Sequence, residues 1–160
     1  MENQPIAMEC LRDLVAFHTE RIRGYQVLLR RLTPMDQHLA TLFNAFVRQS
    51  DQLKDELLEM AAILGMNERE LVADGRFGLA WSVVKIVFSS SIPAYPLDKC
   101  RSGENALLIA YHSVEGTEGL PAPIRVMVNR QKREVIAARE WIAHFEGLNG
   151  QPSQPSMPLS

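Results

Sequence analysis

The segment LRDLVAFHTERIRGYQVLLRRL, residues 11–32, decides the fold of this chain. Within it, mostly apolar residues recur at alternating intervals of four and three and form a stripe along one side of a helix. They are Leu11, Val15, His18, Ile22, Tyr25, Leu29 and Leu32. Three further stripes with this spacing are Leu39, Phe43, Phe46, Ser50, Leu53, Leu57, Met60 and Leu64; Leu97, Cys100, Glu104, Leu107, Tyr111 and Val114; and Ile124, Val128, Gln131, Val135, Ala138, Ile142 and Phe145. Such spacing is typical of helices that pack in a left-handed supercoil. Four stripes therefore predict an all-α protein built as a four-helix bundle.

The composition is that of one folded domain. The chain has 160 residues, of which 46% are hydrophobic and 22% are charged, and these values suit a single domain with a full core. The net charge of -2 gives no general attraction to nucleic acid or to anionic membranes. Four arginines of the first helix lie close together: Arg21, Arg23, Arg30 and Arg31. We interpret them as a solvated face balanced by acids of the second helix, with an anion site as the alternative.

Cysteine usage and the N-terminus favour a cytoplasmic protein. The two cysteines, Cys10 and Cys100, do not form a Cys-x-x-Cys pair, so we expect no structural zinc site. The opening residues MENQPIAMEC lack the basic and then apolar pattern of a signal peptide. No apolar run reaches the roughly 20 residues that span a bilayer. We therefore expect free thiols in a reducing cytoplasm and no membrane partner.

Turn signals divide the chain into four helices, expected at about residues 6–32, 34–64, 97–114 and 124–146. The short link at Thr33–Pro34 makes the first two helices antiparallel. Residues 66–96 are long enough to return along the bundle, so we expect a partly helical crossover that makes helices two and three parallel. The bundle domain then covers residues 1–147, because Gly147 is expected to end the last helix. We expect the tail, residues 148–160, to be disordered.

The crossover carries a group of aromatic residues with one lysine, namely Phe77, Trp81, Lys85 and Phe88. One interpretation is that Trp81 covers an open end of the bundle core. The alternative is that the four side chains form a surface for a protein partner.

A set of short motifs spans about residues 8–146. The strongest is LDKCRSGENAL, residues 97–107, which Tyr111 follows one turn later. The weaker ones are Gly24-Tyr25, Gln49-x-x-Gln52, Glu56-Leu57, Trp81-x-x-x-Lys85 and Gln131-x-x-Glu134. Together they resemble a bacterial four-helix-bundle family of unknown function in the ferritin-like superfamily. The resemblance implies a ferritin-like bundle, two hairpins joined by a crossover. It brings no established activity, and membership of the superfamily would suggest a role in a stress response.

The chain departs from that family in two places. The family tends to carry a Cys-x-x-Gly-Glu-like motif in helix one, where this chain has His18-x-x-Arg21-Ile22. That segment lies where Cys100-x-x-Gly103-Glu104 lies in the second half, which suggests a duplication. A histidine common late in helix four is Arg139 here. Both changes remove potential metal ligands.

The metal-ligand pattern of a di-iron centre is incomplete. Such a centre needs a Glu from each of two helices and Glu-x-x-His from each of the other two, and this chain contains no Glu-x-x-His. We therefore expect no cofactor and no catalytic centre. The alternative is a degenerate site for di-iron, another divalent metal or a small ligand, formed by Glu104, His18 and Glu134.

Glu104 is the most informative polar residue, because its stripe would place a carboxylate in an apolar layer where it must be paired, protonated or bound to metal. We favour a hydrogen-bonded layer in which Glu104 meets Gln131 and either His18 or Tyr25, and which fixes the helix register. A boundary position that reaches water and a ligand site are the alternatives. Cys100 is expected to be a small buried hydrophobe, with a reactive thiol as the alternative.

These observations favour a soluble, non-catalytic bundle that binds an unknown protein partner or self-associates, for instance as a homodimer. The candidate residues of its polar core are His18, Cys100, Glu104, Gln131 and Glu134. A ligand-binding bundle centred on Glu104 and a thiol sensor based on Cys100 remain alternatives. No phosphate-binding glycine loop and no basic and aromatic nucleic-acid pattern occur in the sequence.

Overall fold

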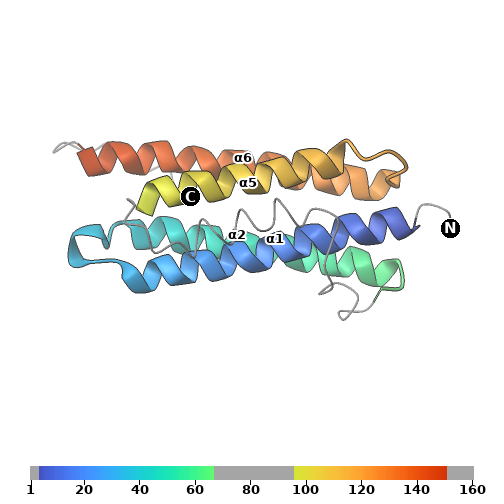
Figure 1. The fold of residues 1–160 in the computed structure, drawn as a ribbon, viewed down its shortest axis with the longest axis horizontal. Helices are drawn as coiled ribbons and strands as arrows, with labels where there is room; N and C mark the ends of the chain where they lie inside the picture. Colours follow the sequence, from blue (N-terminus) through green and yellow to red (C-terminus); the bar gives the residue numbers. More distant parts are fainter. Residues whose placement is uncertain (1–3, 67–95, 151–160) are drawn as a thin grey trace.

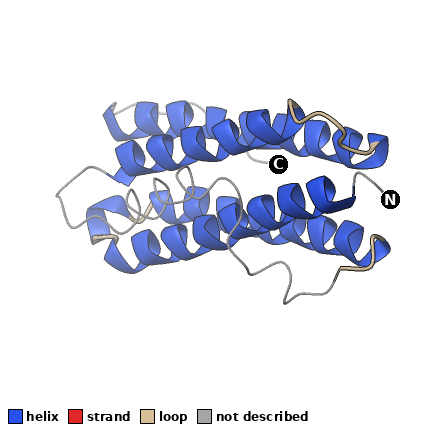
Figure 2. Ribbon diagram, turned by 45° about the vertical axis from the view of Figure 1, so that its right-hand side comes forward, coloured by secondary structure: helices blue, strands red, loops and turns tan. Residues whose placement is uncertain are grey.

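The computed structural model describes residues 4–66 and 96–150, which form four long α-helices (Figures 1 and 2). Helix α1 spans Gln4–Arg31, α2 spans Leu39–Ile63, α5 spans Pro96–Glu115 and α6 spans Ala122–Gly150. A short 3-10 turn, η1 (Pro34–Asp36), links the first two helices. The predicted all-α class is therefore confirmed for the part of the chain that the structure describes.

Neighbouring helices of the bundle are antiparallel. Helix α1 packs against α2 and α5, and α6 packs against the same two helices. Along α1 and α5 the contacts run in opposite directions, because Cys10 approaches Thr117 whereas Tyr25 approaches Cys100. In Figure 1, α1 and α2 form one layer, α5 and α6 form the other, and α2 and α5 run the same way. The parallel arrangement predicted for the second and third helices is confirmed.

The apolar stripes meet along the bundle axis and form one core. The Tyr25 ring lies 4.9 Å from the Phe46 ring and 5.4 Å from the Phe43 ring, measured between centroids. Trp141 of α6 stacks on Phe46 from the other layer, at 6.2 Å. These aromatic contacts join α1, α2 and α6, and each fully buried aromatic side chain contributes roughly 1.5–3 kcal/mol to the hydrophobic term.

Helix α2 ends at Ile63, close to the predicted end at residue 64, and Gly65 follows its C-cap. Gly65 has a φ of 83°, the left-handed conformation that glycine adopts without steric cost. The Met66 amide donates to the Ala61 carbonyl at 2.9 Å, and the Gly65 amide donates to the Ala62 carbonyl at 3.0 Å. This is the Schellman pattern, and the Met66 side chain that follows it is buried in the apolar core.

Two predicted boundaries are wrong. The second helix begins at Leu39 and not at Pro34, because Pro34–Asp36 forms a separate 3-10 turn. The last helix continues through Gly147 to Gly150, since no left-handed residue ends it there and glycine only weakens a helix. The crossover prediction and Phe77, Trp81, Lys85 and Phe88 lie outside the described residues, as do residues 151–160 of the tail. None of the described helices is both long and apolar enough to cross a membrane.

Candidate functional site

A buried ion pair between α1 and α5 lies at the centre of the polar core. Arg21 Nε donates to Glu104 Oε2 at 2.8 Å, and Arg21 Nη2 donates to Glu104 Oε1 at 2.6 Å. The side chains are 2% and 0% exposed, respectively. The geometry is the bidentate fork that a guanidinium forms with a carboxylate. Burying one of these charges alone would be costly, so each requires the other.

Aromatic rings and a hydroxyl complete the surroundings of the Arg21 guanidinium. Its central carbon lies 4.9 Å from the Phe46 ring centroid and 6.0 Å from that of Tyr25. The Phe46 distance suits a cation–π contact. Arg21 Nη1 also donates to Ser50 Oγ on α2 at 2.9 Å. The cation is thus held by three helices, because Ser50 and Phe46 belong to α2, Glu104 belongs to α5 and Arg21 itself belongs to α1.

Tyr25 and Cys100 extend the site on the Glu104 side. The Tyr25 hydroxyl donates to Glu104 Oε2 at 2.7 Å, so in its contact with Cys100 at 3.1 Å the oxygen accepts the thiol proton. Burial is the largest cause that raises the pKa of Cys100 well above its usual value. Cys100 is fully buried and keeps its proton. The alternative of an accessible, easily ionised thiol therefore does not fit this position.

His18 connects the ion pair to the far side of the core. His18 Nδ1 lies 2.8 Å from Ser50 Oγ, and His18 Nε2 lies 2.6 Å from the Tyr111 hydroxyl. Tyr111 donates its own proton to Gln131 Oε1 at 2.6 Å, so Nε2 must be the donor toward Tyr111. Nδ1 then accepts the Ser50 proton, while Ser50 Oγ accepts from Arg21. These directions assign the Nε2-protonated, neutral tautomer to His18.

The electrostatic surroundings of His18 agree with that assignment. Burial, and then the positive charge of Arg21, lower the pKa of His18 well below 6.5. Burial is likewise the largest cause that raises the pKa of Tyr111. Both groups therefore keep the protonation states that the hydrogen bonds require.

The hydrogen-bonded chain reaches the molecular surface through α6. Gln131 Nε2 donates to the Leu53 carbonyl at 3.2 Å and to Glu56 Oε1 at 3.3 Å. Glu56 also pairs with Arg130, whose other nitrogen donates to Glu134 at 3.0 Å. We call the buried part of this series of hydrogen bonds the core network. Its members are Cys100, Tyr25, Glu104, Arg21, Ser50, His18, Tyr111 and Gln131. All four helices contribute to it.

The structure brings together four of the five predicted core residues, although not as direct neighbours. His18, Cys100, Glu104 and Gln131 are fully buried members of the network. Glu104 accepts a hydrogen bond from Tyr25, which the prediction offered as a further partner, but its main partner is Arg21 and not Gln131. Glu134 stays at the surface, 47% exposed, and pairs with Arg130. It does not converge with Glu104 and His18.

Arg21 is the residue that the sequence interpretation placed wrongly. The sequence analysis predicts a solvated arginine face that includes it, yet its side chain is only 2% exposed. The signal that could have found it is its spacing, because Arg21 lies three residues after His18 and four before Tyr25. That places it on the same helix face as both. Ser50 and Tyr111 lie on the predicted stripes, but the stripes do not identify them as partners of His18.

The core network does not fit a di-metal centre. Such a centre needs several carboxylates that bridge two cations, whereas both oxygens of Glu104 accept hydrogen bonds from Arg21 and Tyr25. The guanidinium of Arg21 already supplies the positive charge beside this carboxylate. Among the described residues, no group of three or more His, Cys, Asp or Glu side chains is arranged to hold a metal ion.

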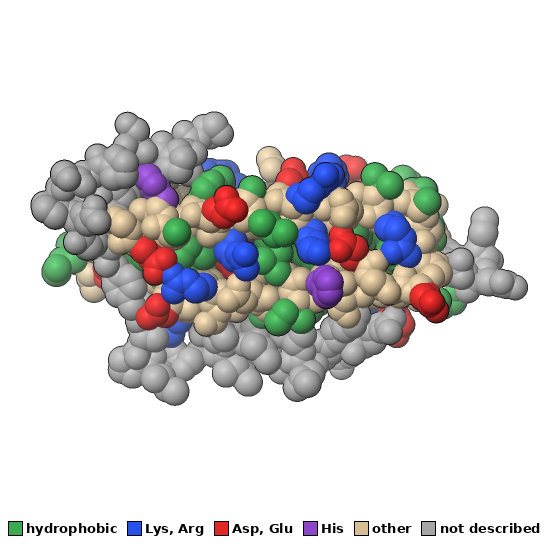
Figure 3. All heavy atoms as spheres, turned by 90° about the horizontal axis from the view of Figure 1, so that it is seen from above, with side chains coloured by type: hydrophobic (Ala, Val, Ile, Leu, Met, Phe, Trp, Pro, Cys, Tyr) green, Lys and Arg blue, Asp and Glu red, His purple; other side chains and the backbone are tan. Residues whose placement is uncertain are grey.

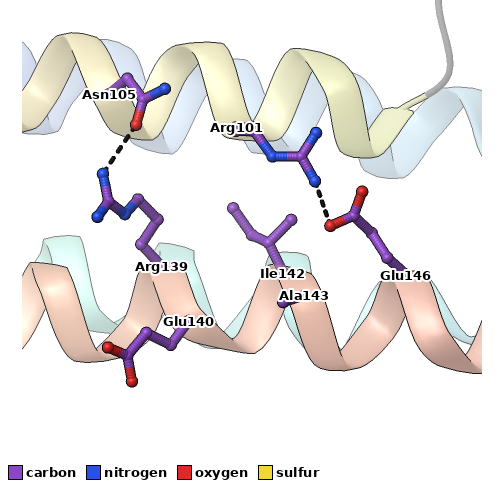
Figure 4. Close-up of a pocket in the computed structure, with 7 residues that line it drawn as sticks. All are labelled: Arg101, Asn105, Arg139, Glu140, Ile142, Ala143 and Glu146. Atoms are coloured by element: carbon purple, nitrogen blue, oxygen red, sulfur yellow. Dashed lines mark hydrogen bonds and ion pairs between the residues drawn. The ribbon is translucent and has the colours of Figure 1, made fainter.

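The surface over α5 and α6 carries charges of both signs among apolar side chains (Figure 3). A shallow groove of about 370 Å³ lies there above Ile142 and Ala143 (Figure 4). Arg139 donates to Asn105 at 2.9 Å across it, and Arg101 pairs with Glu146. Arg139, which stands where the resembling family has a histidine, thus joins two helices. The lining of this groove holds two arginines and two glutamates, so its formal charges balance.

Comparison of the chain with family models, with curated proteins and with solved structures finds no match. The resemblance to a ferritin-like family therefore rests on the sequence motifs, and functional inference rests on the geometry of the bundle.

Proposed function

We propose that this chain is a non-catalytic interaction protein, a ferritin-like four-helix bundle that acts by self-association or by binding a protein partner. Its place in the ferritin-like superfamily, a soluble existence in a bacterial cytoplasm and a role in a stress response belong to the same proposal, and the sequence motifs support them. The core network has a structural role in it, because it holds the two hairpins in one register.

The Arg21–Glu104 pair is the observation that carries this proposal. A catalytic or ligand-binding carboxylate needs an open position beside it, yet Glu104 is fully buried and both its oxygens are bonded to groups of the same chain. The remaining members have fixed donor and acceptor roles that run from Arg21 to Gln131. A network with every role assigned favours one packing of the helices over alternatives.

The alternative, a degenerate metal or small-ligand site at Glu104, is less well supported. It requires His18 and Glu134 to join Glu104, and the surface position of Glu134 opposes this. It also requires His18 Nδ1 or Nε2 as a free ligand, whereas Ser50 and Tyr111 occupy these two nitrogens.

Metal content and metal-dependent melting of the tag-free protein test the proposal, with Glu104→Gln measured beside the parent. We expect no stoichiometric iron, manganese or zinc and no rise in melting temperature on adding any of them. Glu104→Gln should melt lower than the parent with or without metal, because it leaves the buried Arg21 charge without its counter-ion. A metal-induced rise in the parent that disappears in Glu104→Gln would overturn the proposal and favour the metal site.

A further inference from the structure

Helices α2 and α6 form a face with a hollow at one end and protruding apolar side chains at the other. The hollow is a groove of about 390 Å³ beside Trp141, and small side chains line it, among them Ala45 and Ala137. At the opposite end, Ile63 and Val126 are 78% and 70% exposed and border a second groove of about 320 Å³. We call this surface the α2/α6 face. Clustered apolar side chains of this kind on a surface typically mark an interaction site.

The middle of the α2/α6 face lies where Gln131 donates to the Leu53 carbonyl at 3.2 Å. On α2, Arg48 lies before this level and Glu59 lies after it, at about the same number of residues from it. Both side chains line the grooves. On α6, Arg130 and Glu134 border the same level from opposite sides. Each of these two helices therefore carries a positive and a negative side chain on opposite sides of the middle, at similar distances from it along α2.

This arrangement makes the face complementary to itself. A half-turn about an axis that lies in the face and crosses both helices at their middle places Arg48 of one copy over Glu59 of the other. The same half-turn places the Arg130 position over the Glu134 position. Two-fold interfaces require this property, because each residue then meets its complement twice.

The shape of the face follows the same symmetry. Ile63 and Ala45 lie at similar distances from the middle along α2, and Val126 and Ala137 do so along α6. The half-turn therefore brings the protruding Ile63 and Val126 over the small side chains of the hollow. Protrusion against hollow is the packing that removes apolar surface from water without leaving voids.

We propose that the α2/α6 face binds a second copy of this chain, antiparallel to the first, in a two-fold symmetric homodimer. This inference rests on the proposed function and names the partner of that interaction protein. From Thr41 to Ile63 the face extends about 33 Å at about 1.5 Å per residue, and two helices of about 10 Å diameter make it about 20 Å wide. Both copies together would bury about 1,300 Å², within the range of specific interfaces.

A charge exchange tests the face and its orientation together. Sedimentation equilibrium of the full chain would compare the parent with Arg48→Glu, Glu59→Arg and the double variant. We expect a dimeric parent and a dissociation constant raised about tenfold or more in each single variant, since like charges then face each other. The double variant should return to within about threefold of the parent, because the exchange restores opposite charges. Circular dichroism would establish that each variant keeps its helical content.

Two lysine substitutions provide the matched control. Ile63→Lys places a charge on the α2/α6 face and should give a monomer. Ile109→Lys does the same at a 63% exposed isoleucine of α5, outside the face, and should leave the dimer unchanged.

A parent that remains monomeric at every accessible concentration would overturn the homodimer. A dimer that survives Ile63→Lys but is lost in Ile109→Lys would place the interface elsewhere, and a double charge variant that stays weak would refute the antiparallel orientation. None of these outcomes depends on metal, so a failure here is distinguishable from a failure of the proposed function, which the metal-dependent melting of Glu104→Gln decides.

Discussion

The two hairpins of this bundle each supply one charge of the buried ion pair. The α1/α2 hairpin supplies the buried cation Arg21 and the imidazole His18, whereas the α5/α6 hairpin supplies the buried carboxylate Glu104 and the thiol Cys100. When the two motifs of the sequence are set side by side, His18 lies where Cys100 lies and Ile22 lies where Glu104 lies. In the structure, the charge that each hairpin supplies to this pair is met by the other hairpin. The charged core is therefore complete only when the hairpins dock, and it can select the correct register between them.

The hydroxyl groups show a similar division. Tyr25 of the first hairpin donates to Glu104, and Tyr111 of the second donates to Gln131 after accepting from His18. One tyrosine thus binds a charged acceptor and the other lies in a neutral relay. Substitutions in the charged part and in the neutral part of the network should show how much each part contributes to the free energy of unfolding.

The largest effect is expected from removing one charge of the ion pair. Arg21→Met leaves Glu104 buried without its cation and should lower the free energy of unfolding by about 3–5 kcal/mol. The combined change Arg21→Met with Glu104→Met should cost much less than the sum of the two single changes, because no buried charge remains. Urea unfolding of the four proteins measures this coupling.

If the two single changes were additive, the ion pair would contribute no specific coupling between the hairpins. Matched substitutions of the partly exposed pair Lys132–Glu115, whose side chains are 22% and 25% exposed, are the control. Their coupling should be about 1 kcal/mol or less, since water and salt screen that pair.

The next effect depends on pH and comes from His18. Its pKa in the folded protein lies well below the value of 6.5 that an unfolded chain would show. Below about pH 6.5 the unfolded state therefore binds a proton that the folded state does not. Stability from this group is complete above pH 6.5 and falls as the pH is lowered, by up to about 1.4 kcal/mol per pH unit.

Urea unfolding between pH 7.5 and pH 5 measures this slope, with His18→Gln and His112→Gln compared with the parent. His18→Gln should remove most of the slope. His112→Gln should leave it unchanged, because His112 is exposed on α5. Equal slopes in the parent and in His18→Gln would contradict the assignment of a neutral His18.

The all-α class could be predicted from the sequence because the spacing of apolar residues along a helix can be read within one segment, without knowledge of its partners. The stripes identified the core sides of the helices, and they placed Glu104, Gln131 and His18 inside. The partner of Glu104 was missed for a definite reason: from His18 to Tyr25, the helix face can be traced through Ile22 or through Arg21. Hydrophobicity selects Ile22, which is only half-buried, while Arg21 is buried.

Pairings between helices were beyond the sequence, since they depend on register and on side-chain reach. Glu134 illustrates this point, because Val135 and not Glu134 faces the core after Gln131. The helix ends show a second limit. Gly65 adopts the left-handed conformation and ends α2, whereas Gly147, the same residue type, lies within α6. Local sequence does not determine which of these outcomes occurs.

A smaller effect is expected at the neutral relay. Tyr111→Phe removes one hydroxyl. It leaves His18 Nε2 without its acceptor and Gln131 Oε1 without the hydroxyl that donates to it. We expect a loss of about 1–3 kcal/mol in the free energy of unfolding, the usual cost of buried groups left unpaired. Tyr25→Phe leaves Glu104 with both Arg21 bonds and should cost less. If Tyr25→Phe lowered the free energy of unfolding more than Tyr111→Phe, the Tyr25 hydroxyl would be the more stabilising of the two, contrary to this prediction.

The smallest effect is expected at the surface between α5 and α6. Arg101 pairs with Glu146, but both side chains are 41% exposed, so solvent and salt screen their attraction. Arg101→Ala should change the free energy of unfolding by about 0–1 kcal/mol, and 1 M salt should abolish the difference. The buried pair should keep most of its coupling in the same salt, because ions do not reach Arg21 and Glu104. Unfolding at low and high salt therefore separates the pair that joins two hairpins in the core from the pair that bridges two helices of one hairpin in water. A strong effect of Arg101→Ala that persists in salt would mean that the second hairpin is held together by its surface rather than by the apolar contacts of α5 and α6.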